Sequence, residues 1–333
     1  MTLQSSHTDS AQRNLGFQGR DFDWDSYIRH RPVYSENLYK RIYHYHSSNP
    51  LNTFDSVHDV GAGIGTVSEN LARQFEHVIV SEPNSEYLKV AAGRLSPALG
   101  ISEGLRGGDG GRVEEGRFTY LAERAEKSSV ASGSVDMVVI SEAIHWTDIP
   151  SSISEFARQL KSGGTLCIIQ YGLIRFLDND EAQEVWTALF KDVQKITDEW
   201  DDAMRGVYFR AGSSMATGFD NVAFPERDWK PGVKRIFTNT GGERRRVGFA
   251  IGWGEEEDRV VPADERVSVE EDEDWISEGC DLKWLQGVFA SFVPGRKVEE
   301  DLERWQEMEK AIGGRNGTVT IAWPNVQILA TRI

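Results

Sequence analysis

Hydrophobic positions along the middle of the chain alternate between two spacings, and this alternation predicts a parallel sheet with crossover helices. Short runs rich in Val, Ile, Phe and Leu are typical of buried strands, at residues 57–60, 78–80, 118–121, 135–140 and 165–170. Apolar residues at helical spacing follow at 66–74, 85–95 and 149–160. Strands and helices in alternation indicate an α/β fold with right-handed crossovers. The stretch 96–117 lacks such spacing and is expected to be a surface insertion.

The pattern changes on both sides of this region. Before it, residues 26–46 predict a short helix, a turn at Arg31-Pro32 and a longer helix. After it, apolar stripes and helix-end signals predict further helices, at 185–200, 282–292 and 299–312. The run 318–331 predicts closing strand material with a bend or edge at Pro324.

These changes divide the chain into five expected parts. Residues 1–20 are polar and predict a disordered tail, and 21–50 predict an N-terminal helical cap. Residues 51–172 form the predicted α/β core, and 173–315 a helical lid rich in Trp. Within that lid, 238–278 is Gly-rich and then densely acidic, which is typical of a mobile surface insertion. Residues 316–333 are expected to supply the closing strand of the core sheet.

Charge and cysteine content narrow the possible partners of the chain. Its 333 residues carry 37 Lys and Arg against 53 Asp and Glu, a formal net charge of −16. Nucleic acids and acidic membrane surfaces bind mainly through Lys and Arg, so neither is expected as a partner. The two cysteines form no disulfide framework and no CxxC pattern, which indicates a reducing, cytoplasmic setting. No long apolar run occurs, so we expect a soluble protein. We expect it to be a monomer or a weak homodimer. His44 and His46 lack a nearby acid or cysteine, and no metal site is expected.

A glycine-rich turn follows the first predicted strand. Gly61, Gly63 and Gly65 are spaced GxGxG, with Asp59 two residues ahead of them. Glycine lets the backbone approach a ligand closely, and Glu82 at the end of the next strand is where a carboxylate accepts ribose hydroxyls. The dinucleotide fingerprint is GxGxxG, and Thr66 replaces its last glycine. The arrangement therefore favours S-adenosylmethionine (SAM) over NAD.

The motifs around this turn resemble those of class I SAM-dependent methyltransferases. Residues 59–65 resemble motif I of that family, and Glu82 lies where its ribose-binding acid lies. Residues 142–146 and the Y-x3-RP-x-Y pattern from Tyr27 to Tyr34 are similar to the trans-aconitate methyltransferase-like, fungal small-molecule branch. The resemblance implies a Rossmann-like fold with SAM as cofactor and a small-molecule acceptor in secondary metabolism. It implies that the methyl group goes first to a carboxylate or hydroxyl oxygen, and that nitrogen or sulfur is a second choice.

The resemblance also implies two sets of site residues. The cofactor set comprises Asp59, Gly61, Ala62, Gly63, Gly65, Glu82, Pro83, Ala125, Glu126, Glu142 and Trp146. The acceptor and catalytic set comprises Tyr27, Arg31, Tyr34, Tyr171 and His145, the last as a candidate base because imidazole titrates near neutrality. Each residue also has a plainer interpretation as turn, cap or packing.

Two other functions keep the same SAM site. The chain either methylates its acceptor, or uses SAM structurally in a methyltransferase-fold cyclase or pericyclase, or serves as a non-catalytic regulator. A carboxylate acceptor would arrive deprotonated and need no base, whereas a hydroxyl would need one.

Overall fold

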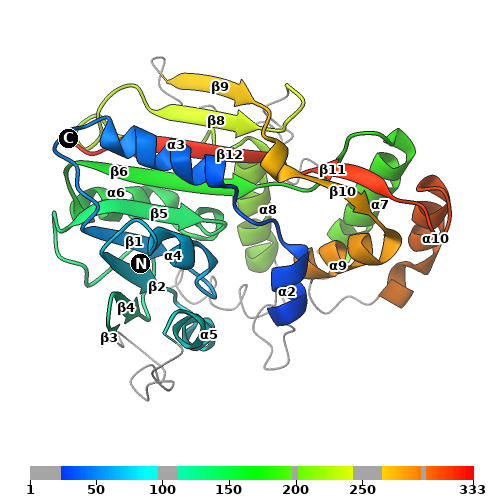
Figure 1. Ribbon diagram of the computed structural model, residues 1–333, viewed down its shortest axis with the longest axis horizontal. Helices are drawn as coiled ribbons and strands as arrows, with labels where there is room; N and C mark the ends of the chain where they lie inside the picture. The colour runs from blue at the N-terminus through cyan, green and yellow to red at the C-terminus, as the bar shows by residue number, and fades with distance from the viewer. Residues whose placement is uncertain (1–23, 97–111, 197–201, 243–264, 294–297) are drawn as a thin grey trace.

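A nine-stranded sheet forms the centre of the computed structural model, which describes residues 24–96, 112–196, 202–242, 265–293 and 298–333 (Figure 1). The strand order is β3-β4-β2-β1-β5-β6-β12-β8-β9. The expected tail 1–20 lies outside the described residues. The strands are β1 (Ser56–Val60), β2 (His77–Ser81), β3 (Arg112–Glu115), β4 (Phe118–Leu121), β5 (Val135–Ser141), β6 (Leu160–Tyr171), β8 (Lys234–Thr238), β9 (Arg266–Glu270) and β12 (Asn325–Thr331).

The five strands expected from the sequence are neighbours in this sheet and run parallel. β1 pairs with β2 and β5, β2 with β4, and β5 with β6, all in parallel. β12 lies antiparallel between β6 and β8. The mostly parallel α/β fold is therefore confirmed, and the carboxyl ends of β1, β2, β4 and β5 meet at one edge, where open α/β sheets bind ligands.

Helices cover both faces of the sheet. α3 (Glu36–Ser47) begins at Ser35, whose hydroxyl caps the Leu38 N–H, and it buries Leu38 and Ile42 on one face. α6 (Ile149–Gln159) is capped by Asp148 and buries Phe156 on the other. β6 begins directly after α6, so residues 161–164 belong to the strand. Further helices are α2 (Trp24–His30), α4 (Thr66–Leu71), α5 (Ser85–Leu95) and α8 (Asp202–Ala216).

A second, smaller unit lies at the end of the molecule shown on the right of Figure 1. Its three-stranded antiparallel sheet has the order β10-β11-β7, and α2 packs against its helix α9. Trp186, Phe289 and Trp305 are buried in its core. The elements are β7 (Arg175–Phe176), α7 (Asp180–Ile196), β10 (Ile276–Cys280), α9 (Leu282–Phe292), η6 (Val298–Asp301), α10 (Leu302–Ala311) and β11 (Val319–Ala322).

The second half of the chain differs from the expected division. The segment expected to be the lid supplies β8 and β9 of the main sheet, and the closing segment contains two strands, with β11 in the small sheet and β12 in the main one. The mobile insertion expected over 238–278 is wrong for 265–278, which holds β9, the 3-10 turn η5 (Glu273–Trp275) and the start of β10. Its order has a physical cause: Asp272 is buried and paired with Arg41, and Trp275 is buried beside it.

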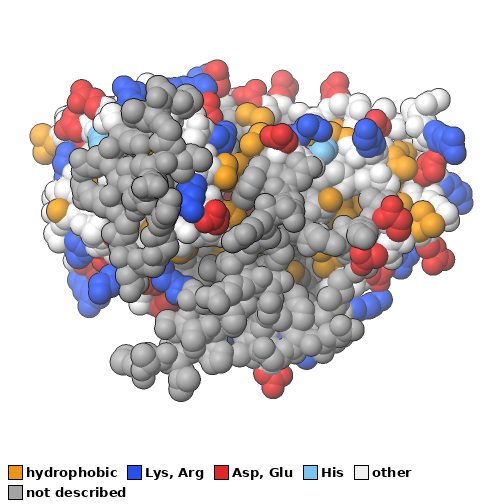
Figure 2. All heavy atoms as spheres, turned by 90° about the horizontal axis from the view of Figure 1, so that it is seen from below, with side chains coloured by type: hydrophobic (Ala, Val, Ile, Leu, Met, Phe, Trp, Pro, Cys, Tyr) orange, Lys and Arg blue, Asp and Glu red, His pale blue; other side chains and the backbone are white. Residues whose placement is uncertain are grey.

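Charged side chains of both signs are interspersed in the coloured part of the face shown in Figure 2. Basic side chains thus lie between acidic ones on this part of the surface. Within the described ranges, no helix is long and apolar enough to cross a membrane.

Candidate active site

Three glycines form the turn between β1 and α4, and each adopts a left-handed backbone. φ is 64° at Gly61, 56° at Gly63 and 79° at Gly65, a region that other residues enter at a cost. A Cβ on Gly61 would lie 2.6 Å from the Cβ of Ala143, whereas one on Gly63 would meet no described heavy atom within 4 Å. The turn is therefore packed against the end of β5 at Gly61, and its backbone is accessible at Gly63.

Glu82 follows β2 and turns its carboxylate towards the glycine turn. One oxygen accepts the Gly63 N–H at 3.2 Å, and the other accepts the Asn84 N–H at 2.9 Å. Burial raises the pKa of Glu82 to about 7, although both hydrogen bonds oppose the shift. Each carboxylate oxygen retains a lone pair for a further donor. Pro83 is exposed beside it.

Asp59, the penultimate residue of β1 before the glycine turn, is a second buried acid. Its Oδ2 accepts the hydroxyl of Ser68 at 2.5 Å, and this bond links the strand to α4. Burial raises the pKa of Asp59 to about 7, and the nearby Glu82 charge adds to the shift. The two acids thus form one electrostatic unit next to the glycine turn.

The chain leaves β5 through a strained residue. Glu142 has a positive φ of 55°, which is uncommon for a residue with a Cβ and is concentrated at functional sites. Its carboxylate accepts the Tyr171 N–H at 2.5 Å and the Gln170 amide at 2.8 Å. Burial raises the pKa of Glu142 to about 8 against the effect of these bonds and of Arg31. These hydrogen bonds to the end of β6 keep Glu142 in its strained backbone conformation.

His145 and Trp146 lie on a single 3-10 turn, η2 (Ile144–Trp146), beyond Glu142. The His145 ring is buried, 4.9 Å from the Trp146 ring and 6.3 Å from the Phe219 ring between centroids. Burial lowers the pKa of His145 to about 3, and Gln170 opposes this shift only in part. The imidazole is therefore neutral at physiological pH and binds a proton weakly.

Ala125 and Glu126 follow β4. Ala125 is buried, and Glu126 Oε1 accepts the Asp148 N–H at 2.9 Å just ahead of α6. Glu126 thus fixes the loop that carries the start of α6. Ala62 lies in the glycine turn and donates its N–H to the Ser81 carbonyl at 3.0 Å.

Arg31 connects the N-terminal segment with the main sheet and with α9. Its guanidinium donates to the Tyr171 hydroxyl at 3.1 Å and to the Ser291 carbonyl at 2.7 Å. The guanidinium carbon lies 3.8 Å from the Phe292 ring centroid and 4.9 Å from that of Tyr27. Arg31 makes no ion pair with a residue of the described chain, and its Nε has no hydrogen-bond partner there. The guanidinium thus lies among aromatic rings, and the Glu142 carboxylate interacts with it through its charge without forming an ion pair.

Aromatic side chains surround this guanidinium. The Tyr34 hydroxyl hydrogen-bonds to Ser141 Oγ at 2.6 Å, at the end of β5. Its ring contacts those of Tyr171 and Trp275 edge-on, with centroids 6.2 and 5.9 Å apart. The Tyr171 ring also contacts Trp323, 5.7 Å away. The predicted residues Tyr27, Arg31, Tyr34, Glu142 and Tyr171 therefore come together.

The cofactor and acceptor groups are also linked to each other. Arg31 of the acceptor set lies close enough to Glu142 of the cofactor set to lower the pKa of that carboxyl, against the larger effect of burial. Among the described residues, Arg31 Nε of this site is buried without a hydrogen-bond partner, so it can donate to an oxygen of a bound ligand.

Several residues of this site were not expected from the sequence. Ser68, Ser141, Gln170, Ser291 and Phe292 contact the predicted residues but carry no motif of their own. Only Gln170 gives a local signal, as an amide at the end of an otherwise apolar strand. The partners on α9 depend on the second unit, whose position no local pattern indicates.

Comparison with known proteins agrees with this geometry. Residues 58–168 match the family described as a methyltransferase domain. The chain is 32% identical to the methyltransferase AacuQ of Aspergillus aculeatus, over 95% of this chain and 94% of the relative. It is 28% identical to the methyltransferase ptaI of Pestalotiopsis fici, over 94% of each. A solved structure from Anaeromyxobacter dehalogenans, described as a type II methyltransferase, has the same fold, with a TM-score of 0.54, 17% identity, and coverage of 90% of this chain and 97% of that one.

The sheet, the glycine turn and the acid after β2 define a class I SAM-dependent methyltransferase, with SAM as its cofactor. With the extended match to AacuQ, the chain belongs to the family of methyltransferases represented by these fungal enzymes.

Proposed function

We propose that the chain transfers the methyl group of SAM to an oxygen of a small acceptor in secondary metabolism, with a carboxylate as the preferred acceptor group. Phenolic or alcoholic hydroxyls rank second, and nitrogen or sulfur third. In this proposal, segment 21–50 caps the site and the unit of α7, α9 and α10 closes the acceptor side.

The residues present fit SAM at the carboxyl edge of the sheet. Glu82 has a lone pair on each carboxylate oxygen for a ribose hydroxyl, and the accessible Gly63 backbone permits close approach. By family resemblance we assign Asp59 to the methionine end, Ala125, Glu126 and Pro83 to the adenine side, and Glu142 and Trp146 to the inner wall. When bound, SAM supplies an electrophilic methyl group on a sulfonium, so the protein mainly orients the acceptor and excludes water.

The half-buried Arg31, whose Nε is buried, is the observation on which the choice of acceptor rests. Its guanidinium lies among Tyr27, Tyr171 and Phe292 without an ion pair to a carboxylate of the described chain. A buried charge is costly unless paired, and a guanidinium matches a carboxylate with two donors. An anionic oxygen on an aromatic body would satisfy both the charge and the rings around it.

The chemistry of His145 favours the same acceptor. The pKa of about 3 makes this imidazole a weak base, so removal of a proton from an alcohol is not well supported. A carboxylate needs no such step, because it is ionised at neutral pH. We therefore propose that His145 contributes a hydrogen bond to the acceptor, while Tyr34 and Tyr171 position its body.

Methyl-labelled SAM tests this function. The protein is incubated with labelled SAM and an aromatic carboxylic acid, and in parallel with the corresponding primary alcohol, and products are read by mass spectrometry. We expect labelled methyl ester and little ether. Product without label would instead indicate a cyclase that uses SAM structurally, and a folded protein that does not bind SAM in calorimetry would indicate a regulator.

A further inference from the structure

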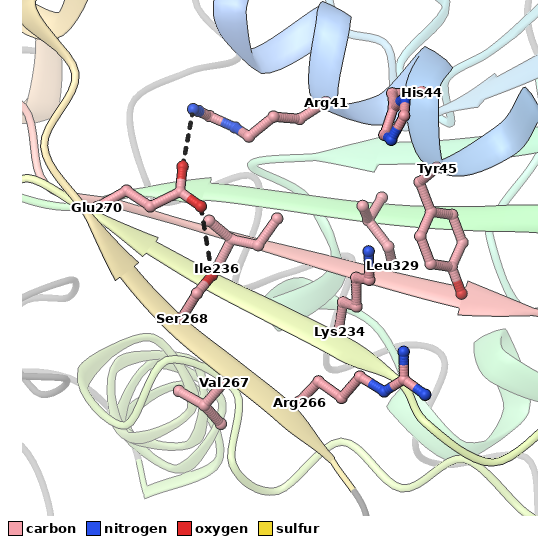
Figure 3. Close-up of a pocket in the computed structure, with 10 residues that line it drawn as sticks. All are labelled: Arg41, His44, Tyr45, Lys234, Ile236, Arg266, Val267, Ser268, Glu270 and Leu329. Carbon is pink, nitrogen blue, oxygen red and sulfur yellow. Dashed lines mark hydrogen bonds and ion pairs between the residues drawn. The ribbon is translucent and has the colours of Figure 1, made fainter. Parts of the chain in front are cut away.

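A pocket of about 310 Å³ lies between α3 and the outer strands of the main sheet, away from the glycine turn (Figure 3). Arg41, His44 and Tyr45 come from α3, and the floor comes from β8, β9 and Leu329 of β12. In the paired strands, Lys234 and Leu329 lie level with Cys167, four residues before Tyr171 at the carboxyl end of β6. The pocket therefore extends along the outer strands, from Glu270, which is level with Tyr171, to Lys234 and Arg266, which are level with Cys167.

Two like charges stand next to each other on the floor of this pocket. Lys234 of β8 and Arg266 of β9 are direct partners in the strand register, so both side chains project from the same face of the sheet. Two like charges this close repel each other, and solvent screens part of the repulsion because Arg266 is exposed.

The acidic side chains near the pocket form ion pairs with a different cation, Arg41. Glu270 and Asp272 both pair with Arg41, at 3.3 and 3.4 Å, and Glu270 Oε1 also accepts Ser268 Oγ at 3.4 Å. In Figure 3 this acidic end is separate from the end where Lys234 and Arg266 lie. Neither Lys234 nor Arg266 forms an ion pair with any residue of the described chain.

The remaining lining suits a small anion with an apolar or aromatic body. Lys234 Nζ lies 5.4 Å from the Tyr45 ring centroid, and Arg266 is close enough to lower the pKa of the Tyr45 phenol, which burial otherwise raises. Ile236 and Leu329 add apolar side chains to the floor of the pocket. The volume lies at the lower end of the range for small-molecule pockets, roughly 300 Å³.

We propose that this pocket is a second ligand site, which binds the oxyanion of a small phosphate or carboxylate between Lys234 and Arg266. The anion would neutralise the two like charges that the strand register holds together, and Tyr45 would flank it. The site is remote from methyl transfer and does not depend on the function proposed above.

Inorganic phosphate and benzoate are the two probes, each titrated at constant ionic strength into the full chain while its melting temperature and binding heat are recorded. We expect saturable binding of at least one probe, with Tm raised by about 5 °C at a hundred times its Kd. Lys234→Met and Arg266→Met should each weaken that binding at least tenfold, since half of the cationic pair is lost. Lys230→Met, which removes an exposed lysine outside the pocket, is the matched control and should bind normally.

The two probes separate the possible ligand sources. Tighter binding of phosphate identifies a phosphate-bearing ligand, and tighter binding of benzoate a carboxylate with an aromatic body. Equal stabilisation of all variants, or no saturable binding of either probe, would overturn the proposal. SAM affinity, measured in the same samples, should be the same in all variants, so failure of this site is distinguishable from failure of the methyltransferase site.

Discussion

Replacing Glu82 by alanine should weaken SAM binding and leave the fold intact. The carboxylate is fixed by the N–H groups of Gly63 and Asn84, at 3.2 and 2.9 Å, and each oxygen has one lone pair left. Loss of two hydrogen bonds to ribose hydroxyls should cost about 1–3 kcal/mol, a five- to 150-fold rise in Kd. The Kd of Glu82→Gln for SAM should lie between those of the wild type and Glu82→Ala. The amide nitrogen of the glutamine would face one of the two backbone N–H groups and could not accept a hydrogen bond from it.

Isothermal calorimetry with SAM measures this effect, and Glu86→Ala is the matched control. Glu86 is an exposed acid on α5 whose partner is Lys89, so its loss should change SAM binding little. The pKa of Glu82, raised to about 7 by burial, adds a pH signature: SAM affinity of the wild type should rise between pH 6 and 8 as the carboxyl ionises. That rise should shrink in Glu82→Ala. Equal affinity and an unchanged pH dependence in this variant would remove Glu82 from the site.

Three further perturbations test the geometry of the site. Burial raises the pKa of Asp59 from 3.8 to about 7, so the folded chain holds a proton that the unfolded chain releases, and this contribution to stability is lost as pH rises between those values. Asp59→Asn should therefore flatten the fall in Tm from pH 5 to 8; an unchanged slope would contradict the burial argument. Gly61→Ala, at φ 64° and 2.6 Å from the Ala143 Cβ, should lose roughly 2–4 kcal/mol of unfolding free energy in urea, whereas Gly93→Ala within α5, with open space around it, should gain about 1 kcal/mol. A Gly61→Ala protein as stable as wild type would refute the strain. His145→Asn should leave the pH profile of kcat between pH 6 and 9 unchanged, because the pKa of His145 is about 3. If the wild type shows a change in kcat near pH 6.5 that the variant lacks, the His145 ring titrates there and this expectation is wrong.

The core of the fold was predictable because its signals are local. Apolar runs for β1, β2, β4, β5 and β6 and the glycine turn are all contiguous in the sequence. Parallel strands with crossover helices then follow from chain connectivity, and so does the placing of Glu82 beside Gly63.

The second half was less predictable because its contacts are distant in the sequence. β8 and β9 are short and contain charges, and β9 is paired on one side only, so neither has the apolar run of a central strand. Asp272 was counted with an acidic, solvated stretch, yet it is buried by contacts with Ser35 and Arg41, more than 200 residues away. Net charge along a segment does not show which of its acids has a buried partner.

The acceptor side of the site follows the same rule. Arg31 and Tyr34 were expected there from the cap motif, but Ser291 and Phe292 reach the guanidinium only through packing of α2 against α9. The pKa of His145 could not be inferred either, since it depends on burial by Trp146 and Phe219.

The role of Arg31 in holding an anionic acceptor is tested most directly by one ratio. The specificity constant kcat/KM is measured for an aromatic carboxylic acid and for its primary alcohol, by label transfer from SAM, in wild type, Arg31→Lys and Arg31→Met. We expect the wild type to prefer the acid, and Arg31→Met to lose about 10- to 150-fold on the acid alone, with partial recovery in Arg31→Lys. An equal loss on both acceptors, or an unchanged preference for the acid in Arg31→Met, would contradict a guanidinium that binds the acceptor carboxylate.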